Sequence, residues 1–460
     1  MTRWQDREWE PNEDLARLLR ASKFGHEALA LRVNELARQA GKDTQYTHTS
    51  VTNWVTRGMI PRGPVPACIA AALGERLGRR VDVAEIGMDT PSCGNRSMGL
   101  DFPRDPADAV RGAIAFWRDV DRRKFLNNTF AVGAFTIPVT RWLSVPADAA
   151  SGHHGARRVG RGDLDELWQA VEEARLWDSR FGGGNWKASS TAQCLRQRAT
   201  PLLQGTYTER VGQELFRVTA ELSRQIGWSA FDNGQHDAAQ RYLIQALRLA
   251  RAAGDVEVGA YVLTTMSLAS FLRGHPVEAA DMAEGAYERA KGIAGPKVLS
   301  FARLAEARAL ARAGHAGAAK TALARSEELL NQAQPDRDPT WMAYYSAERL
   351  ATDATEIHRD LGDPAAALRW SRRADTMPAT RYTRAVGIRL AVEADSHLQN
   401  NDLEQSLAVG HRSVELLSRV HSARAHSYVR SLTEALAPQK KDERVQEFIG
   451  HARRELAFAS

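Results

Sequence analysis

Apolar residues close to the N-terminus recur at helical spacing and predict a small helical domain. Leu15, Leu18 and Leu19 fall on one face of a first helix. Asn12 precedes them as a good N-cap, and the acidic residues that follow it suit the positive end of a helix dipole. A second helix is indicated between Gly25 and Gly41 by three apolar residues on one face: Leu29, Val33 and Leu36.

A third helix is predicted within residues 47–58, with polar side chains opposite its apolar side. Val51, Trp54 and Val55 form the side expected to be buried, and Gly58 is expected to end the helix. Such a helix fits the major groove of DNA, where Asn pairs with adenine, Arg with guanine, and a Thr methyl group contacts thymine. The residues left on the outward face are Ser50, Thr52, Asn53, Thr56 and Arg57.

A closing helix follows the third, since Val65, Ile69, Leu73 and Leu77 recur at helical spacing. Several side chains around these two helices are candidates for holding DNA phosphates, because they are basic or can donate hydrogen bonds. They are His48, Arg62, Arg79 and Arg80. The pattern by itself also fits a small helical bundle whose polar helix binds nothing.

The third helix carries a more specific signature. Val51, Trp54, Arg57-Gly58 and Pro61 occur in this order, which resembles the recognition helix of Cro/repressor-type (XRE-like) helix-turn-helix regulators. The longer stretch 48–66 is similar to a large group of actinobacterial regulators of this type. The connection over residues 41–48 is longer than the usual turn, which leaves the register of base contacts open. The resemblance implies that the base-reading residues are Thr49, Ser50, Thr52, Asn53 and Arg57.

Small turn residues recur through the C-terminal two thirds of the chain. Gly234, Gly274 and Gly314 are 40 residues apart, and Gly362 and Asn401 continue the series. Asn in place of Gly fits a left-handed backbone position, which both residues tolerate. Small residues follow each turn at plus five and plus twelve: Ala239 and Ala246, Ala279 and Ala286, Ala319 and Ser326, Ala367 and Ala374, and Ser406 and Ser413.

Such small residues let two helices approach closely, so a repeated turn followed by such a helix predicts a solenoid of helical hairpins. The pattern resembles tetratricopeptide (TPR) repeats, in which the small turn residue precedes the second helix of each pair. The interval of 39 to 48 residues exceeds the usual ~34, so the helices must be longer or the connections looser. An irregular α-bundle rich in alanine is the alternative. The expected fold is all-α, a helix-turn-helix bundle followed by a TPR-like α-solenoid.

Residues 91–162 are rich in Pro, Gly and Arg and predict a linker with one or two helices, one of them from Asp108 to Leu126. The string Arg122-Arg123-Lys124-Phe125-Leu126 resembles a twin-arginine export motif. It lies more than a hundred residues inside the chain, however, and the apolar stretch after it is too short to span a bilayer. We interpret 121–139 as a buried or interdomain packing segment, and His153-His154 as a solvated loop tip.

The charge of the chain favours a polyanionic partner for its first third. The net charge is +6, of which residues 1–90 carry +1 and residues 91–162 carry +5, whereas 163–460 has 38 residues of each sign. Residues 44–80 contain five arginines and one acid, beside the third helix. The three cysteines, Cys68, Cys93 and Cys194, form no disulfide framework, and the first ten residues have no secretory signal. We therefore expect a cytoplasmic protein without a membrane partner.

Motifs that would indicate an enzyme are missing from the sequence. His26-Glu27 begins an HExxH string, but position 30 is Ala. The Gly-rich stretch 181–187 does not have the P-loop spacing, and we interpret it as a turn between helices. We expect no catalytic activity, no cofactor and no metal site.

These features predict a three-part chain that regulates transcription. The parts are an XRE-like helix-turn-helix DNA-binding domain over 1–90, an arginine-rich linker over 91–162 and a TPR-like sensor or dimerisation domain over 163–460. We expect a homodimer that binds operator DNA and is controlled by a peptide, small molecule or protein on the concave face of the repeats. The resemblance implies a repressor of differentiation or secondary metabolism. The alternative is a protein-interaction adaptor or peptide receptor in which DNA binding is lost or secondary.

Overall fold

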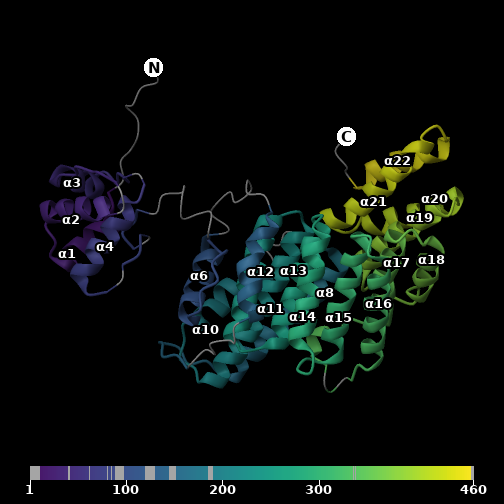
Figure 1. Ribbon diagram of the computed structural model, residues 1–460, viewed down its shortest axis with the longest axis horizontal. Coiled ribbons are helices and arrows are strands. Elements are labelled where there is room, and N and C mark those ends of the chain that lie inside the picture. Colours follow the sequence, from purple (N-terminus) through teal and green to yellow (C-terminus); the bar gives the residue numbers. More distant parts are fainter. Residues whose placement is uncertain are drawn as a thin grey trace. The chain divides into compact units, whose positions relative to one another are not determined.

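The computed structural model describes residues 11–39, 42–61, 63–79, 81–83, 85–88, 98–119, 130–144, 152–184, 190–334, 336 and 338–456. Within these ranges all regular secondary structure is helical, and β-pairing is confined to isolated bridges at His153 and Arg158. The predicted all-α fold class is therefore confirmed. None of the helices in the described ranges has the length and apolar character needed to cross a membrane. The chain divides into two compact units, Met1–Ser97 and Met98–Ser460 (Figure 1), and each is described by itself.

The described residues of the first unit form four helices, all at the predicted places. They are α1 (Glu13–Ser22), α2 (His26–Gln39), α3 (His48–Thr56) and α4 (Val65–Leu77). Leu15, Leu29, Val51 and Ile69, one from each helix, are completely buried in a shared core. The apolar faces expected from helical spacing therefore meet as a single hydrophobic cluster.

Asn12 caps α1 as predicted and also fastens two other parts of this unit. Its Oδ1 accepts a hydrogen bond from the Leu15 backbone N–H at 2.9 Å, and its Nδ2 donates to the Ile86 carbonyl at 2.8 Å. Its backbone N–H donates to the Val55 carbonyl at 2.7 Å. One buried residue thus joins the start of α1, the end of α3 and the chain after α4.

We expect Asn12→Ala to loosen α1. The substitution removes the N-cap and leaves the buried Ile86 carbonyl without its donor, which together cost about 2 kcal/mol. Hydrogen exchange of the α1 amides in the full chain measures this as a lower free energy of local opening. Asn53→Ala is the matched control, because no hydrogen bond from the Asn53 side chain occurs in the described residues. Equal exchange rates in the two variants would contradict the assigned role of Asn12.

Most of the second unit consists of helix pairs joined by short turns, six in the described residues. The first helix of each pair also contacts the first helix of the next pair. The first helices are α11 (Glu209–Asp232), α13 (Val256–Leu272), α15 (Pro296–Arg312), α17 (Ala347–Asp360), α19 (Thr383–Gln399) and α21 (Ala423–Ala435). The second helices are α12 (His236–Ala252), α14 (Pro276–Ala290), α16 (Ala316–Asn331), α18 (Pro364–Arg373), α20 (Leu403–Leu417) and α22 (Glu443–Leu456). This stack is compatible with the predicted TPR-like solenoid.

The turn residues identified in the sequence have the predicted left-handed conformation. The φ angles of Gly234, Gly274 and Gly314 are 81°, 82° and 83°, and that of Gly362 is 68°. Asn401 has φ 60°, so the replacement of Gly by Asn in the last repeat is confirmed as a conformational equivalent. In these five pairs the second helix begins two residues after the turn residue, whereas α21 and α22 are joined by the longer connection 436–442.

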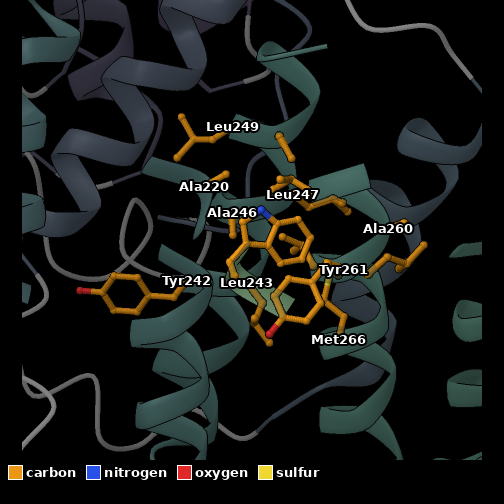
Figure 2. Close-up of a cluster of buried hydrophobic side chains, with 14 of the residues drawn as sticks. Ala220, Tyr242, Leu243, Ala246, Leu247, Leu249, Ala260, Tyr261 and Met266 are labelled. Carbon is orange, nitrogen blue, oxygen red and sulfur yellow. The ribbon is translucent and has the colours of Figure 1, made fainter. Parts of the chain in front are cut away.

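The small residues that follow each turn lie between the two helices of a pair, where they are fully buried. Where Ser replaces Ala at plus twelve, its hydroxyl bonds to the partner helix. Ser326 Oγ donates to the Ser300 carbonyl at 2.8 Å, and Ser413 Oγ donates to the Gly387 carbonyl at 2.8 Å. In Figure 2, Ala246 lies among larger side chains of α12 and α13, such as Leu243 and Tyr261. The small residues therefore set a close approach between helices, as expected.

The region predicted as a linker places two helices on the second unit. They are α6 (Pro106–Asp119) and α7 (Thr136–Ser144), and both contact α12. Polar side chains of α12 bind backbone carbonyls of this region: Gln245 donates to Gly99 at 2.8 Å and Gln240 to Ala131 at 2.6 Å. Residues 98–119 and 130–144 are thus part of the second unit, whereas residues 120–129, which include the arginine pair, lie outside the described ranges.

Further helical segments complete the unit. α8 (Arg161–Phe181) precedes the pairs, and α9 (Ser190–Cys194), a π-helical turn (Leu195–Ala199) and α10 (Thr200–Leu203) connect it to α11. The 3₁₀ turns in the part of this unit that the structure describes lie at Val132–Phe135, Thr340–Met342 and Ala437–Gln439. His153 and His154 are exposed on the loop before α8, as expected, although His153 Nδ1 also donates a hydrogen bond to the Gly205 carbonyl at 2.7 Å.

Candidate nucleic-acid interface and central cavity

Helix α3 is held against the first unit by its apolar side. Val51 is completely buried and Trp54 almost so, while Val55 is half-buried. The Tyr46 ring meets Trp54 edge-on, with 5.0 Å between ring centroids. This packing fixes the rotation of α3 about its axis and so determines which residues lie on its outward face.

The long connection between α2 and α3 is fastened by one side chain of α2. Asn34 Oδ1 accepts hydrogen bonds from the Tyr46 backbone N–H and the Thr44 hydroxyl, both at 2.9 Å. Asn34 Nδ2 donates to the Tyr46 carbonyl at 2.9 Å. Although this connection is longer than the usual tight turn, these hydrogen bonds fix its backbone just before α3 begins.

Asn53 and Arg57 are the predicted base-reading residues whose side chains are uncommitted. Arg57 is exposed and Asn53 half-buried, and neither side chain makes a hydrogen bond or ion pair within the described residues. Thr49 is also exposed, and its hydroxyl lies 3.4 Å from the ring of His48. The outward face of α3 thus presents a methyl-bearing hydroxyl, an amide and a guanidinium.

Ser50 and Thr52 have partners inside the first unit. Ser50 Oγ accepts from the Thr47 backbone N–H at 3.2 Å and completes a capping box at the start of α3. Thr52 Oγ donates to the His48 carbonyl at 3.0 Å and lies 3.0 Å from His26 Nδ1 on α2. Both side chains are half-buried, so their first role is to shape and dock the helix.

The predicted phosphate contacts are placed only in part. His48 and Arg79 are exposed, and Arg79 forms an ion pair with Glu85 at 2.9 Å. Arg62 and Arg80 lie outside the described residues. Met59 and Ile60, directly after α3, are exposed apolar residues that sequence reasoning missed, although their position between Gly58 and Pro61 was a signal.

Residues 15–89 match a family model described as the SP15 N-terminal domain. The match covers α1 to α4, including the whole of α3, and does not extend into the second unit. No curated protein matches the chain.

The second unit contains a partly open central cavity of about 100 Å³. The first helices of all six described pairs contribute lining residues, and α8 contributes three more. Because one cavity is bordered by every first helix, the pairs must curve around it. Aromatic side chains form much of its wall: Trp228, Tyr261, Phe301, Tyr344, Tyr382 and Tyr428.

Arginine dominates the polar lining of the central cavity. In the described residues seven arginines line it, against three carboxylates, Asp178, Asp353 and Glu356. The arginines are Arg175, Arg224, Arg308, Arg349, Arg384, Arg389 and Arg424. Burial raises the pKa of Glu356, but Arg308 and two further arginines beside it hold that pKa down at about 2. The carboxylate is therefore ionised and already neutralised by arginine.

A buried ion network closes the ring of helices on one side of the cavity. Asp232 at the end of α11 is completely buried. It accepts hydrogen bonds from Arg384 of α19 and from Arg424 of α21, both at 2.9 Å. Arg384 also donates to Asp178 of α8 at 2.6 Å. Burial alone raises the pKa of Asp232, but the two guanidiniums hold it below its ordinary value. Four helices from distant parts of the sequence meet at this network.

The Gly-rich stretch after α8, residues 182–184, lies beside this ion network. The His421 backbone N–H donates to the Phe181 carbonyl at 2.9 Å, and the Gly184 N–H donates back to the His421 carbonyl at 3.1 Å. The Gly183 N–H donates to Asp232 at 3.0 Å. Residues 182–184 of the stretch therefore join the end of α8 to the connection before α21, and residues 185–187 lie outside the described ranges.

Groups suited to metal binding or disulfide chemistry do not occur in the described ranges. Within them no three His, Cys, Asp or Glu side chains are placed to hold a metal ion. Cys68 and Cys194 are buried free thiols, and Cys93 lies outside the described residues.

Proposed function

We propose that this protein is a sequence-specific DNA-binding transcriptional regulator. The observation that carries the proposal is the outward face of α3, where Asn53 and Arg57 have uncommitted side chains while Val51 and Trp54 anchor the helix. The resemblance of this segment to XRE-like recognition helices points the same way. It also suggests repression of differentiation or secondary metabolism as the biological outcome.

In the proposed complex α3 enters the major groove. Asn53 pairs with adenine, Arg57 with guanine, and the Thr49 methyl group contacts thymine. Arg79 and His48 bind phosphates and position the helix without reading sequence. Two copies of the chain bind two half-sites, and the second unit senses an effector in the cytoplasm and changes the affinity of the pair for the operator.

The salt dependence of DNA retention tests the proposal. A regulator that neutralises several phosphates binds promoter DNA tightly at low salt and loses affinity steeply as salt rises, because counterions are released on binding. Purified full-length protein is passed over immobilised promoter fragments of its own genome at increasing salt. Lack of retention at the lowest salt would contradict the proposal and favour a protein-interaction adaptor.

Single substitutions on and beside α3 are expected to separate base reading from phosphate binding. Asn53→Ala and Arg57→Ala are each expected to reduce the binding free energy on a specific site by about 1 to 3 kcal/mol, and to change it little on random DNA. Arg79→Ala weakens binding to all sequences alike. Binding isotherms on the two DNAs measure the difference, and Arg17→Ala is the control, since Arg17 is an exposed residue on α1 that pairs with Asp14. Equal losses on both DNAs for all variants would overturn these roles.

A further inference from the structure

The central cavity leaves room for a small molecule. Helix α8 contacts both α11 and α19, and its residues Arg175, Asp178 and Ser179 form part of the cavity wall. A helix of the chain itself therefore occupies much of the space that the inner helices surround. The remaining space of about 100 Å³ accommodates a compact ligand.

The polar side chains that line this cavity are mostly hydrogen-bond donors, because arginines outnumber carboxylates among them. Arg175, Arg308 and Arg389 are 6 %, 6 % and 4 % exposed. Among the described lining side chains no buried acceptor is left unpartnered. A guanidinium donates hydrogen bonds and accepts none, so a ligand that contacts the lining arginines must supply acceptor atoms.

Three guanidiniums lie close together in one part of the wall. Arg384 pairs with Asp178 and Asp232, and Arg424 shares Asp232. Arg349 has a single 3.3 Å hydrogen bond to Asp353, which also pairs with Arg308. Burial, together with repulsion by Arg384 and Arg349, keeps the pKa of Arg424 below its ordinary value in spite of Asp232. An anion placed beside Arg349 is attracted by all three groups.

The rest of the wall is suited to a planar ring. Tyr261 and Tyr344 lie side by side, with their hydroxyls 3.0 Å apart, and Tyr261 packs against Phe301 with 5.7 Å between ring centroids. Arginines cover both tyrosines, with Arg224 4.4 Å from the Tyr261 ring centre and Arg175 5.5 Å from that of Tyr344. The guanidinium planes of such a stack can themselves pack on an aromatic ligand.

We propose that the central cavity binds a small anion, a carboxylate or phosphate attached to a planar ring, with Arg349 as the principal contact for the charged group. The proposal deepens the proposed function and rests on it in one respect, since it names this anion as the effector of the regulator. It replaces the three open effector classes, peptide, small molecule or protein, with one.

Binding of defined probes to the full-length protein tests this inference. Salicylate and phenyl phosphate supply a ring with each anionic group, benzyl alcohol supplies the ring without charge, and inorganic phosphate supplies charge without the ring. We expect at least one ring-bearing anion to raise Tm and to bind with one site per chain in calorimetry. Inorganic phosphate binds more weakly, and benzyl alcohol gives no shift. The preferred anion tells a carboxylate effector from a phosphorylated one.

Arg349→Gln is expected to weaken binding of the preferred probe by about tenfold or more, because the substitution removes a charge-assisted hydrogen bond. Arg349→Lys keeps the positive charge, so this variant loses less affinity for the probe than Arg349→Gln. Arg303→Gln is the matched control, since the Arg303 side chain is 21 % exposed, against 25 % for Arg349, and pairs with Glu306 outside the cavity. Affinity in this control stays at the level of the unmodified protein.

The proposal is overturned if neither ring-bearing anion shifts Tm, if benzyl alcohol binds equally well, or if Arg349→Gln binds the probe like the unmodified protein. DNA retention of the same preparations is measured without probe. If the protein is retained on DNA but binds no probe, the cavity proposal alone is contradicted. If it binds the probe but is not retained on DNA, the proposed DNA-binding function is contradicted and the ligand site is still supported.

Discussion

Asp232→Ala is expected to lower the free energy of unfolding of the second unit by about 3 to 5 kcal/mol. The carboxylate is completely buried and accepts hydrogen bonds from Arg384, Arg424 and the Gly183 N–H. Its removal leaves two arginines inside the protein with less compensation, and an arginine cannot lose its proton to relieve the penalty. Denaturant unfolding of the full chain, followed by circular dichroism, measures the loss.

Asp281→Ala is the control for this experiment. Asp281 is an exposed residue of α14, and its removal is expected to change stability by less than about 0.5 kcal/mol. If Asp232→Ala is as stable as this control, the network does not hold the ring of helices closed. The cavity would then have to be maintained by apolar packing alone.

Gly182→Ala is expected to destabilise the same unit by about 2 to 4 kcal/mol. Gly182 has φ 82° and ψ −176°, a backbone region that is essentially restricted to glycine. A Cβ at this position would also lie 2.6 Å from the His421 carbonyl oxygen. Either the chain after α8 or the connection before α21 must move, and the two hydrogen bonds between them are strained. Thermal unfolding of the full chain measures the change.

Gly112→Ala is a control of opposite sign. Gly112 lies within α6, and a Cβ there meets nothing within 4 Å. The substitution should stabilise the helix by about 0.5 to 1 kcal/mol, because alanine has the higher helix propensity. A Gly182→Ala variant as stable as Gly112→Ala would show that the left-handed junction does not constrain the fold.

The two substitutions act on the closure of the helix pairs around the cavity. Asp232 and Gly182 belong to α11 and to the end of α8, yet both are fixed by residues near the start of α21. A ligand beside Arg384 and Arg424 therefore contacts the groups that close the ring. This is how binding in the cavity would alter the shape of the second unit in the regulator that we propose.

Local sequence patterns predicted the helices and the repeat turns. A left-handed turn needs Gly or Asn, so Gly234 and Asn401 could be recognised from residue type and spacing alone. The helices of the first unit follow from apolar periodicity and from the Asn12 cap. Such features depend on residues a few positions apart, which is why a single sequence contains them.

Long-range pairings could not be predicted. Arg384 binds Asp178 across 206 positions, and Gln245 binds the Gly99 carbonyl across 146. Nothing in the charge or spacing of these residues identifies the partner, so the packing of residues 98–119 and 130–144 on α12 and the position of α8 at the cavity were missed. The roles of Ser50 and Thr52 were ambiguous for another reason, since a hydroxyl can cap a helix as readily as it can contact a base.

In vitro selection of random duplex DNA by the full-length protein tests the central claim most directly. The account predicts enrichment of one sequence motif, organised as half-sites, with preference lost at particular positions in Asn53→Ala and Arg57→Ala and kept throughout in Arg17→Ala. A selection that enriches no motif, or the same motif with all four proteins, would contradict the assignment of α3 as the reading helix.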